Sequence, residues 1–185
     1  MPYSICLLWS PEAESALATI QRELSSVGIP GWTAQSGHRP HIELAQAGVI
    51  DPASMKAELK KLAQAHKEFE STLLRLELAG QEVLIHLDPS PPLAALHQGL
   101  HSVMKKFAQT IRPEYAPGKW SPKLSLVTGI TPANLESAKP LLGSIRLPWG
   151  ALASSIGVFQ MNPTRMGVQA EVMLGSGLSR DRTHS

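Results

Sequence analysis

The feature that most constrains the fold is a cap residue followed by proline, which occurs at four places in the chain. The pairs are Ser10-Pro11, Asp51-Pro52, Ser90-Pro91 and Thr131-Pro132. A Ser, Thr or Asp oxygen can accept a free N–H at a helix start, and proline suits the first helical position because its φ is fixed and it lacks an N–H. Since the pairs lie about 40 residues apart, we predict a repeated unit in which a helix follows each of four strands.

The periodicity of apolar residues sets the expected extents of the elements. Each predicted helix has an apolar stripe at helical spacing, so each should pack on a sheet. We expect helices at 11–26, 52–68, 92–110 and 132–142. We expect strands at 3–9, 41–49, 73–78, 82–87, 123–130, 144–149, 154–161 and 166–174, with a turn at 162–165 that joins the last two strands into a hairpin.

The order of these elements predicts a diverged duplication of a β-α-β-α-β unit within one α+β domain. The domain should span residues 1–176, with the duplication boundary at about residue 80. The Gly/Ser/Arg-rich end at 177–185 is expected to be a disordered tail.

Composition excludes several classes of protein. A formal net charge of +2 on 185 residues is too small for a general nucleic-acid coat, although it permits a local basic patch. The one cysteine, Cys6, excludes an internal disulfide and argues against a cysteine metal site, so we expect a buried, inert thiol. The apolar run 5–9 lacks a preceding basic region, and no stretch approaches the roughly 20 apolar residues of a membrane span. We therefore expect a cytoplasmic monomer.

A short motif occurs twice. The segment Arg39-Pro40-His41-Ile42-Glu43-Leu44 aligns with Ser121-Pro122-Lys123-Leu124-Ser125-Leu126, and both read Pro, basic residue, apolar, polar, Leu. In two strands, the two-residue side-chain period would place His41 beside Glu43 on one face and Lys123 beside Ser125 on one face, with the apolar residues turned towards a core. We expect the two strands to meet across a groove.

These residues resemble the signature strands of the two-histidine (2H) phosphoesterase superfamily, which includes the 2′-5′ RNA ligases and cyclic nucleotide phosphodiesterases. Each signature of that family reads His, any residue, Ser or Thr, apolar, usually after a proline. The segment from Leu84 to Pro89, followed by Leu93, Leu96, His97 and Trp120, is also similar to the family in order and spacing.

The resemblance implies a bilobal α+β fold in which two pseudo-symmetric, antiparallel-rich sheets, flanked by helices, enclose a central groove. It also implies metal-independent chemistry, with no cofactor, at a nucleotide or RNA end that carries a 2′ or 2′,3′-cyclic phosphate. One histidine removes a proton from the attacking group, the other protonates the leaving oxygen, and the hydroxyls hold the phosphate.

The sequence departs from the signature once in each motif. Glu43 stands at the first Ser/Thr position and Lys123 at the second His position, so only His41 and Ser125 match. Lysine is a poor base near neutral pH but could clamp a phosphate or donate a proton. Glu43 could pair with Lys123 or His41, orient the His41 ring, act as a base, or close the site.

Further candidates flank the motifs. His38 and Arg39 could reach a phosphate, Tyr115 and Lys119 could face a substrate, and Trp120 either stacks on a base or packs under a loop. His97 and His101 have metal-ligand spacing on a helix, but no acidic or Cys partner accompanies them, so we expect no metal site.

Two classes of function stay open. The first is a phosphodiesterase or RNA ligase-like enzyme with His41 and Lys123 as catalytic groups and Ser125 at the phosphate, beside the altered position Glu43. The second is a catalytically inactive protein that binds nucleotides or RNA ends on the same fold. The fallback is an interaction protein whose groove is filled by a pair between Glu43 and Lys123.

Overall fold

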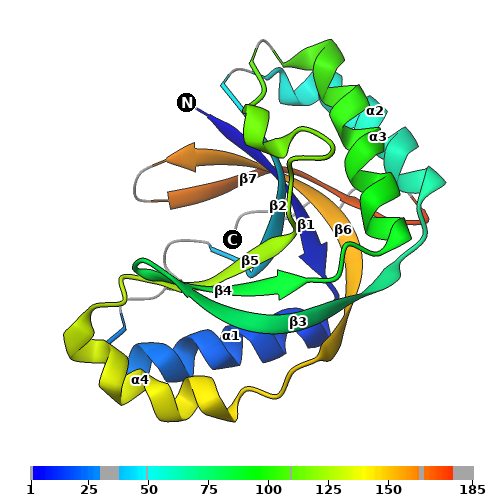
Figure 1. The fold of residues 1–185 in the computed structure, drawn as a ribbon. Helices are drawn as coiled ribbons and strands as arrows, with labels where there is room; N and C mark the ends of the chain where they lie inside the picture. Colours follow the sequence, from blue (N-terminus) through cyan, green and yellow to red (C-terminus); the bar gives the residue numbers. More distant parts are fainter. Residues whose placement is uncertain (1, 30–37, 49, 109, 163–164, 177–185) are drawn as a thin grey trace, which may run out of the picture.

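The computed structural model describes residues 2–29, 38–48, 50–108, 110–162 and 165–176. The described residues form an α+β fold with seven strands (Figure 1): β1 Tyr3–Trp9, β2 His41–Ala47, β3 Phe69–Ala79, β4 Glu82–Leu87, β5 Lys123–Thr128, β6 Trp149–Asn162 and β7 Arg165–Met173. The helices among them are α1 Pro11–Ser26, α2 Pro52–Ala65, α3 Pro91–Phe107, α4 Pro132–Ser144 and a 3-10 turn, Pro113–Tyr115.

All strands belong to one antiparallel sheet with the order β2-β1-β6-β3-β4-β5, and β7 pairs with β6. This order is symmetric. If the labels β1, β2 and β3 are exchanged with β4, β5 and β6, the same order is obtained in reverse, with the same pairs of neighbouring strands. The third strand of each half thus pairs with the first strand of the other half. This symmetry is consistent with a duplicated β-α-β-α-β unit, and the β3–β6 pairing makes the two expected sheets continuous.

The helices cover the two halves of the sheet separately. Helices α2 and α3 pack together beside β6, β7 and β2, whereas α1 and α4 lie against the half formed by β3, β4 and β5 (Figure 1). One continuous cluster of buried apolar residues runs beneath both helix pairs. The opposite face of the sheet is therefore free to carry polar groups.

Three of the four expected helix caps form. The Ser10 hydroxyl accepts from the Ala13 N–H at 3.4 Å, Asp51 accepts from the Ala53 N–H at 3.1 Å, and Thr131 forms a reciprocal capping box with Asn134. Ser90 is the N-cap residue of α3 and Pro91 begins the helix as expected, but the Ser90 side chain makes no cap hydrogen bond.

The predicted strand at 144–149 is wrong. Helix α4 continues to Ser144, and the next strand begins at Trp149. Pro148 has no N–H to donate to a ladder, which explains why pairing starts only after it.

Other element ends move by a few residues. Helix α2 ends at Ala65 and β2 at Ala47, while β3 begins earlier, at Phe69. The β6–β7 hairpin forms with Asn162 opposite Arg165, although the centre of the predicted turn and the predicted tail lie outside the described residues. Within the described part of the chain, no helix is long and apolar enough to cross a membrane.

Candidate active site

The two motifs lie on the two end strands of the sheet order, β2 and β5. These strands share no ladder, yet their residues approach to Cα–Cα distances of 8 Å or less. The sheet therefore curves until its two ends meet, and the motifs meet with them (Figure 1).

The polar residues of both motifs occupy one face of the sheet, which we call the motif face. Ile42, Leu44, Leu124 and Leu126 are fully buried in the core beneath the helices. Because side chains alternate along a strand, His41 and Glu43 on β2, and Lys123 and Ser125 on β5, leave the sheet on the opposite side. A small separate apolar cluster lies at the base of this face beside β2 and consists of Cys6, Leu8 and Phe159.

His41 is held as a neutral ring with a defined tautomer. Its Nδ1 lies 2.7 Å from the carbonyl oxygen of Arg39, which can only accept, so Nδ1 carries the hydrogen and Nε2 keeps its lone pair. Burial lowers the pKa of His41, against the opposing effects of that hydrogen bond and of the negative charge of Glu43. The ring stacks at 6.1 Å from Phe159. His41 therefore has the protonation state of a general base at neutral pH.

His38 lies next to His41, with the ring centroids 5.1 Å apart. Burial, followed by repulsion from His41, lowers the pKa of His38 from 6.5 to about 3. These two adjacent histidines are thus both uncharged at neutral pH.

Glu43 is bound by three neutral donors. Its carboxylate accepts hydrogen bonds from the hydroxyls of Ser4 and Tyr115, and from the Gln46 amide at 2.7 Å. Among the described residues, neither an ion pair nor a hydrogen bond joins Glu43 to Lys123 or to the His41 ring, so neither expected pairing forms. The Glu43–Lys123 pair of the fallback hypothesis is thereby wrong.

Glu43 also holds the segment before the second motif against β2. Tyr115, expected to face a substrate, directs its hydroxyl at the Glu43 carboxylate, and burial, followed by the charge of that carboxylate, raises the pKa of Tyr115. The Trp120 indole N–H donates to the Glu43 carbonyl oxygen at 3.0 Å, and its ring stacks on His97 at 4.0 Å. Trp120 thus packs against β2 and α3, and stacking on a base stays a prediction.

Arg39 is committed to carboxylates rather than exposed at the site. Its guanidinium pairs with Glu14 at 2.6 Å and with Glu171 at 2.9 Å, and the residue is 6% exposed. Glu171 also accepts from the Ser155 hydroxyl at 2.8 Å. This network fixes the backbone of Arg39, whose carbonyl oxygen orients His41, and leaves the guanidinium no free edge for a substrate phosphate.

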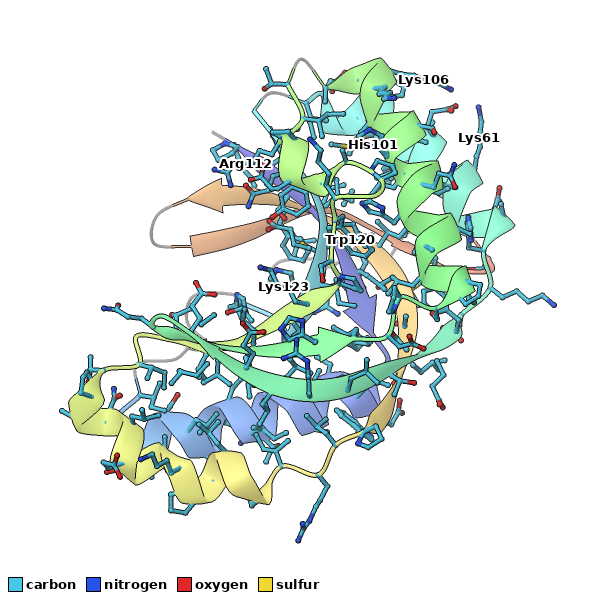
Figure 2. The ribbon with its side chains drawn as sticks, in the orientation of Figure 1. Lys61, His101, Lys106, Arg112, Trp120 and Lys123 are labelled. Carbon is cyan, nitrogen blue, oxygen red and sulfur yellow. The ribbon has the colours of Figure 1, made fainter. Side chains whose placement is uncertain are left out.

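Lys123 and Ser125 keep their polar atoms available. Figure 2 shows Lys123 leaving β5 on the side away from α1 and α4, and the residue is exposed. The hydroxyl oxygen of Ser125 is buried and has no hydrogen-bond partner in the described part of the chain. Lys119 lies in an exposed turn just before β5. Lys123 and Ser125 could therefore bind an anion at the motif face.

No cluster of three or more His, Cys, Asp or Glu residues suited to a metal ion occurs in the described residues. His97 is buried, and its Nε2 lies 3.0 Å from the Tyr115 carbonyl oxygen, so it supports the segment before β5. Cys6 is a buried free thiol, as expected, and burial raises its pKa.

The sequence profile of the 2′-5′ RNA ligase superfamily matches residues 10–162. The chain belongs to this superfamily. The expected relation to 2H phosphoesterases is thereby confirmed. None of the curated proteins compared with the chain matches it.

Solved structures of this superfamily's fold cover nearly the whole chain. TT0787 of Thermus thermophilus has a TM-score of 0.63 at 14% identity and covers 95% of this chain and 99% of its own. LigT of E. coli in apo form gives 0.60 at 16% identity, with coverages of 94% and 96%. LigT complexed with 3′-AMP gives 0.58 at 15%, with coverages of 93% and 96%. At these identities the likeness establishes the fold.

Sequence reasoning missed the donors around Glu43. Ser4 and Gln46 carry no motif of their own, and both are ordinary polar residues on strands. No sequence signal could have found Gln46, because it follows Glu43 by three positions and strand alternation would place it on the other face. A register shift in the β1–β2 ladder brings it to the same face.

Proposed function

We propose that this superfamily member is a metal-independent phosphodiesterase that acts as a monomer on 2′,3′-cyclic or 2′-5′-linked nucleotides and RNA ends. The observation that carries the proposal is the state of His41. A neutral ring with its hydrogen on Nδ1, held by the Arg39 carbonyl, presents Nε2 as a base at the position of the first motif histidine.

In this proposal, His41 Nε2 takes the proton of the attacking water as its oxygen bonds to phosphorus. Positioned proton transfer of this kind contributes about 10²- to 10⁴-fold to a rate. The negative charge that builds on the phosphoryl oxygens is met by Lys123 and by the Ser125 hydroxyl, which is preorganised because it is buried and unpaired. A phosphate oxygen would satisfy that hydroxyl, whose isolation costs about 1–3 kcal/mol.

The neighbours of this fold support the class of ligand. LigT has been solved in complexes with 3′-AMP, with phosphate and with ATP. A phosphate-bearing nucleotide is accordingly the ligand we assign to the motif face.

A second candidate function is binding without turnover, and Glu43 favours it. A carboxylate at the first Ser/Thr position offers no hydroxyl to stabilise the negative charge that builds on the phosphate during turnover. Its three donors, Ser4, Gln46 and Tyr115, hold the carboxylate in place and spread its charge. Such a protein would bind nucleotide ends and release them unchanged.

Turnover of 2′,3′-cyclic AMP and of a 2′-5′ diadenylate, in buffer with EDTA, separates the two functions. The enzyme proposal predicts turnover by the wild type and a fall of about 10²- to 10⁴-fold in His41→Gln. The matched control is the variant His66→Gln. His66 lies just past the end of α2 and not on a motif strand.

Ser125→Ala should weaken binding of 3′-AMP by about tenfold, the equivalent of one hydrogen bond to a charged group. Wild-type binding of 3′-AMP without turnover would establish the binding function instead. If the wild type neither binds 3′-AMP nor turns over either substrate, both functions are excluded.

A further inference from the structure

His86 lies beside the position from which the second motif histidine is missing. It belongs to β4, and in the β4–β5 ladder it stands directly opposite Lys123. Opposed residues of an antiparallel pair emerge on the same face, with Cβ atoms about 4.5–5.5 Å apart. Its neighbours Ile85 and Leu87 are buried in the core. His86 therefore leaves β4 on the motif face, within one side chain of Lys123.

A carboxylate from the next strand orients the His86 ring. Its Nε2 is hydrogen-bonded to Glu77 on β3, and that bond, followed by one from Arg75, lowers the pKa of Glu77. The carboxylate is therefore ionised at neutral pH and can only accept, which places a hydrogen on Nε2 and leaves Nδ1 to exchange a proton. The imidazole side chain is 20% exposed, so Nδ1 is not sealed in the core. A histidine oriented by a carboxylate is the usual arrangement of a proton-transfer pair.

We propose that His86 performs the proton transfer of the missing second histidine and that Lys123 serves only as the phosphate clamp. This inference rests on the proposed phosphodiesterase function. As His41 removes a proton from water and the water oxygen bonds to phosphorus, the phosphorus bond to the leaving 2′ or 3′ oxygen breaks. Protonated His86 gives its Nδ1 proton to that oxygen, and the products are an alcohol and a phosphomonoester.

The charged groups around His86 suit this role. Glu77 neutralises the ring when it is protonated, and Arg75, opposite His86 in the β3–β4 ladder, also pairs with Glu77 at 3.2 Å. Lys123 on β5 adds a second positive charge beside the phosphate.

Three other described histidines are unsuited to this proton transfer. His97 is buried beneath Trp120 and engaged with the Tyr115 carbonyl, and His38, whose pKa burial lowers to about 3, is uncharged at pH 7. His101 projects from α3 (Figure 2), outside the strands that carry the motifs.

Leaving-group dependence tests the role of His86. His86→Gln, the matched control His101→Gln and the wild type are compared on 2′,3′-cyclic AMP and on an aryl phosphodiester whose 4-nitrophenolate leaves without a proton. We expect His86→Gln to lose about 10²- to 10⁴-fold in kcat on the cyclic nucleotide, to lose less than tenfold on the aryl ester and to keep its affinity for 3′-AMP. His101→Gln should match the wild type on both substrates.

Two results would overturn this role. Equal losses on both substrates would mark His86 as structural, and a rate within threefold of wild type on the cyclic nucleotide would show that it transfers no proton. In either case the wild type still turns over, so the proposed function stands. Absence of turnover in the wild type would contradict the proposed function itself. The failure of the proposed function and the failure of the His86 role therefore give different results.

Discussion

At the scale of single residues, the site depends on which ionisable side chains the fold buries uncharged and which it places in ion pairs or hydrogen bonds. The two-residue period predicts that His41 and Glu43 share one face of their strand and that Lys123 and Ser125 share one face of theirs. The partners of Glu43 could not be predicted, because Ser4 and Tyr115 lie 39 and 72 positions away and reach it through the β1–β2 ladder and through the 3-10 turn that packs on β2. His86 was likewise missed, since its significance comes from its register with Lys123.

The buried histidines predict a dependence of stability on pH. Below pH 6.5 His38 becomes protonated in the unfolded chain. In the folded chain it stays neutral, because its pKa there is about 3. The free energy of unfolding therefore decreases as pH falls, by up to about 1.4 kcal/mol per pH unit for this group. Urea unfolding at several pH values between 6.5 and 5 should show a smaller slope in His38→Gln than in the wild type. Equal slopes would mean that His38 is protonated in the folded state.

The Arg39 network predicts a large effect of one buried charge. Arg39→Met leaves Glu171, whose side chain is 1% exposed, without its cation, and should lower the free energy of unfolding by about 3–5 kcal/mol. The control Lys61→Met breaks a pair whose lysine is 72% exposed and should cost less than about 1 kcal/mol. Thermal or urea unfolding measures both. A cost for Arg39→Met as small as the control's would show that the network is not holding the first motif.

At the scale of elements, the segment between α3 and β5 is the least predictable part of the site. The four helices follow from their cap and proline signals and their apolar stripes. This segment has neither, and its conformation comes from contacts with β2: Gly48 N–H to the Thr110 carbonyl at 3.2 Å, Arg112 N–H to the Gln46 carbonyl at 3.0 Å, and Trp120 to Glu43.

Removing the indole hydrogen bond should loosen that segment alone. In Trp120→Phe, hydrogen exchange of the amides of Tyr115, Ala116 and Trp120 should accelerate by up to about tenfold, which corresponds to one hydrogen bond of about 1 kcal/mol. Amides of α1 should exchange as in the wild type. The matched control Trp149→Phe on β6 should leave the segment unchanged. Acceleration spread over the whole chain would instead indicate global destabilisation.

At the scale of the whole molecule, the sheet order makes the two halves interdependent. Helix and strand identities were largely predictable, whereas the exchange of β3 and β6 between the halves was not, because strand neighbours depend on contacts distant in sequence. Each half alone would leave a strand edge unpaired: β1 would lose β6, and β4 would lose β3.

We therefore predict that fragments 1–80 and 81–185 do not fold separately. Each alone should lack dispersed amide signals in its NMR spectrum, and an equimolar mixture refolded together should recover the spectrum of the intact chain. A fragment that unfolds cooperatively by itself would contradict a single domain and would place a true domain boundary near residue 80.

The central claim is that one phosphate site lies between His41 on β2 and His86 on β4, the strand that pairs with the end strand β5. The most direct measurement is the imidazole ¹H–¹⁵N NMR spectrum at pH 7, with and without 3′-AMP. We predict that His41 in the free protein shows the Nδ1–H tautomer and that the ¹⁵N signals of His41 Nε2 and His86 Nδ1 move on titration, while those of His101 stay still. Binding of 3′-AMP that leaves both signals in place would contradict the account.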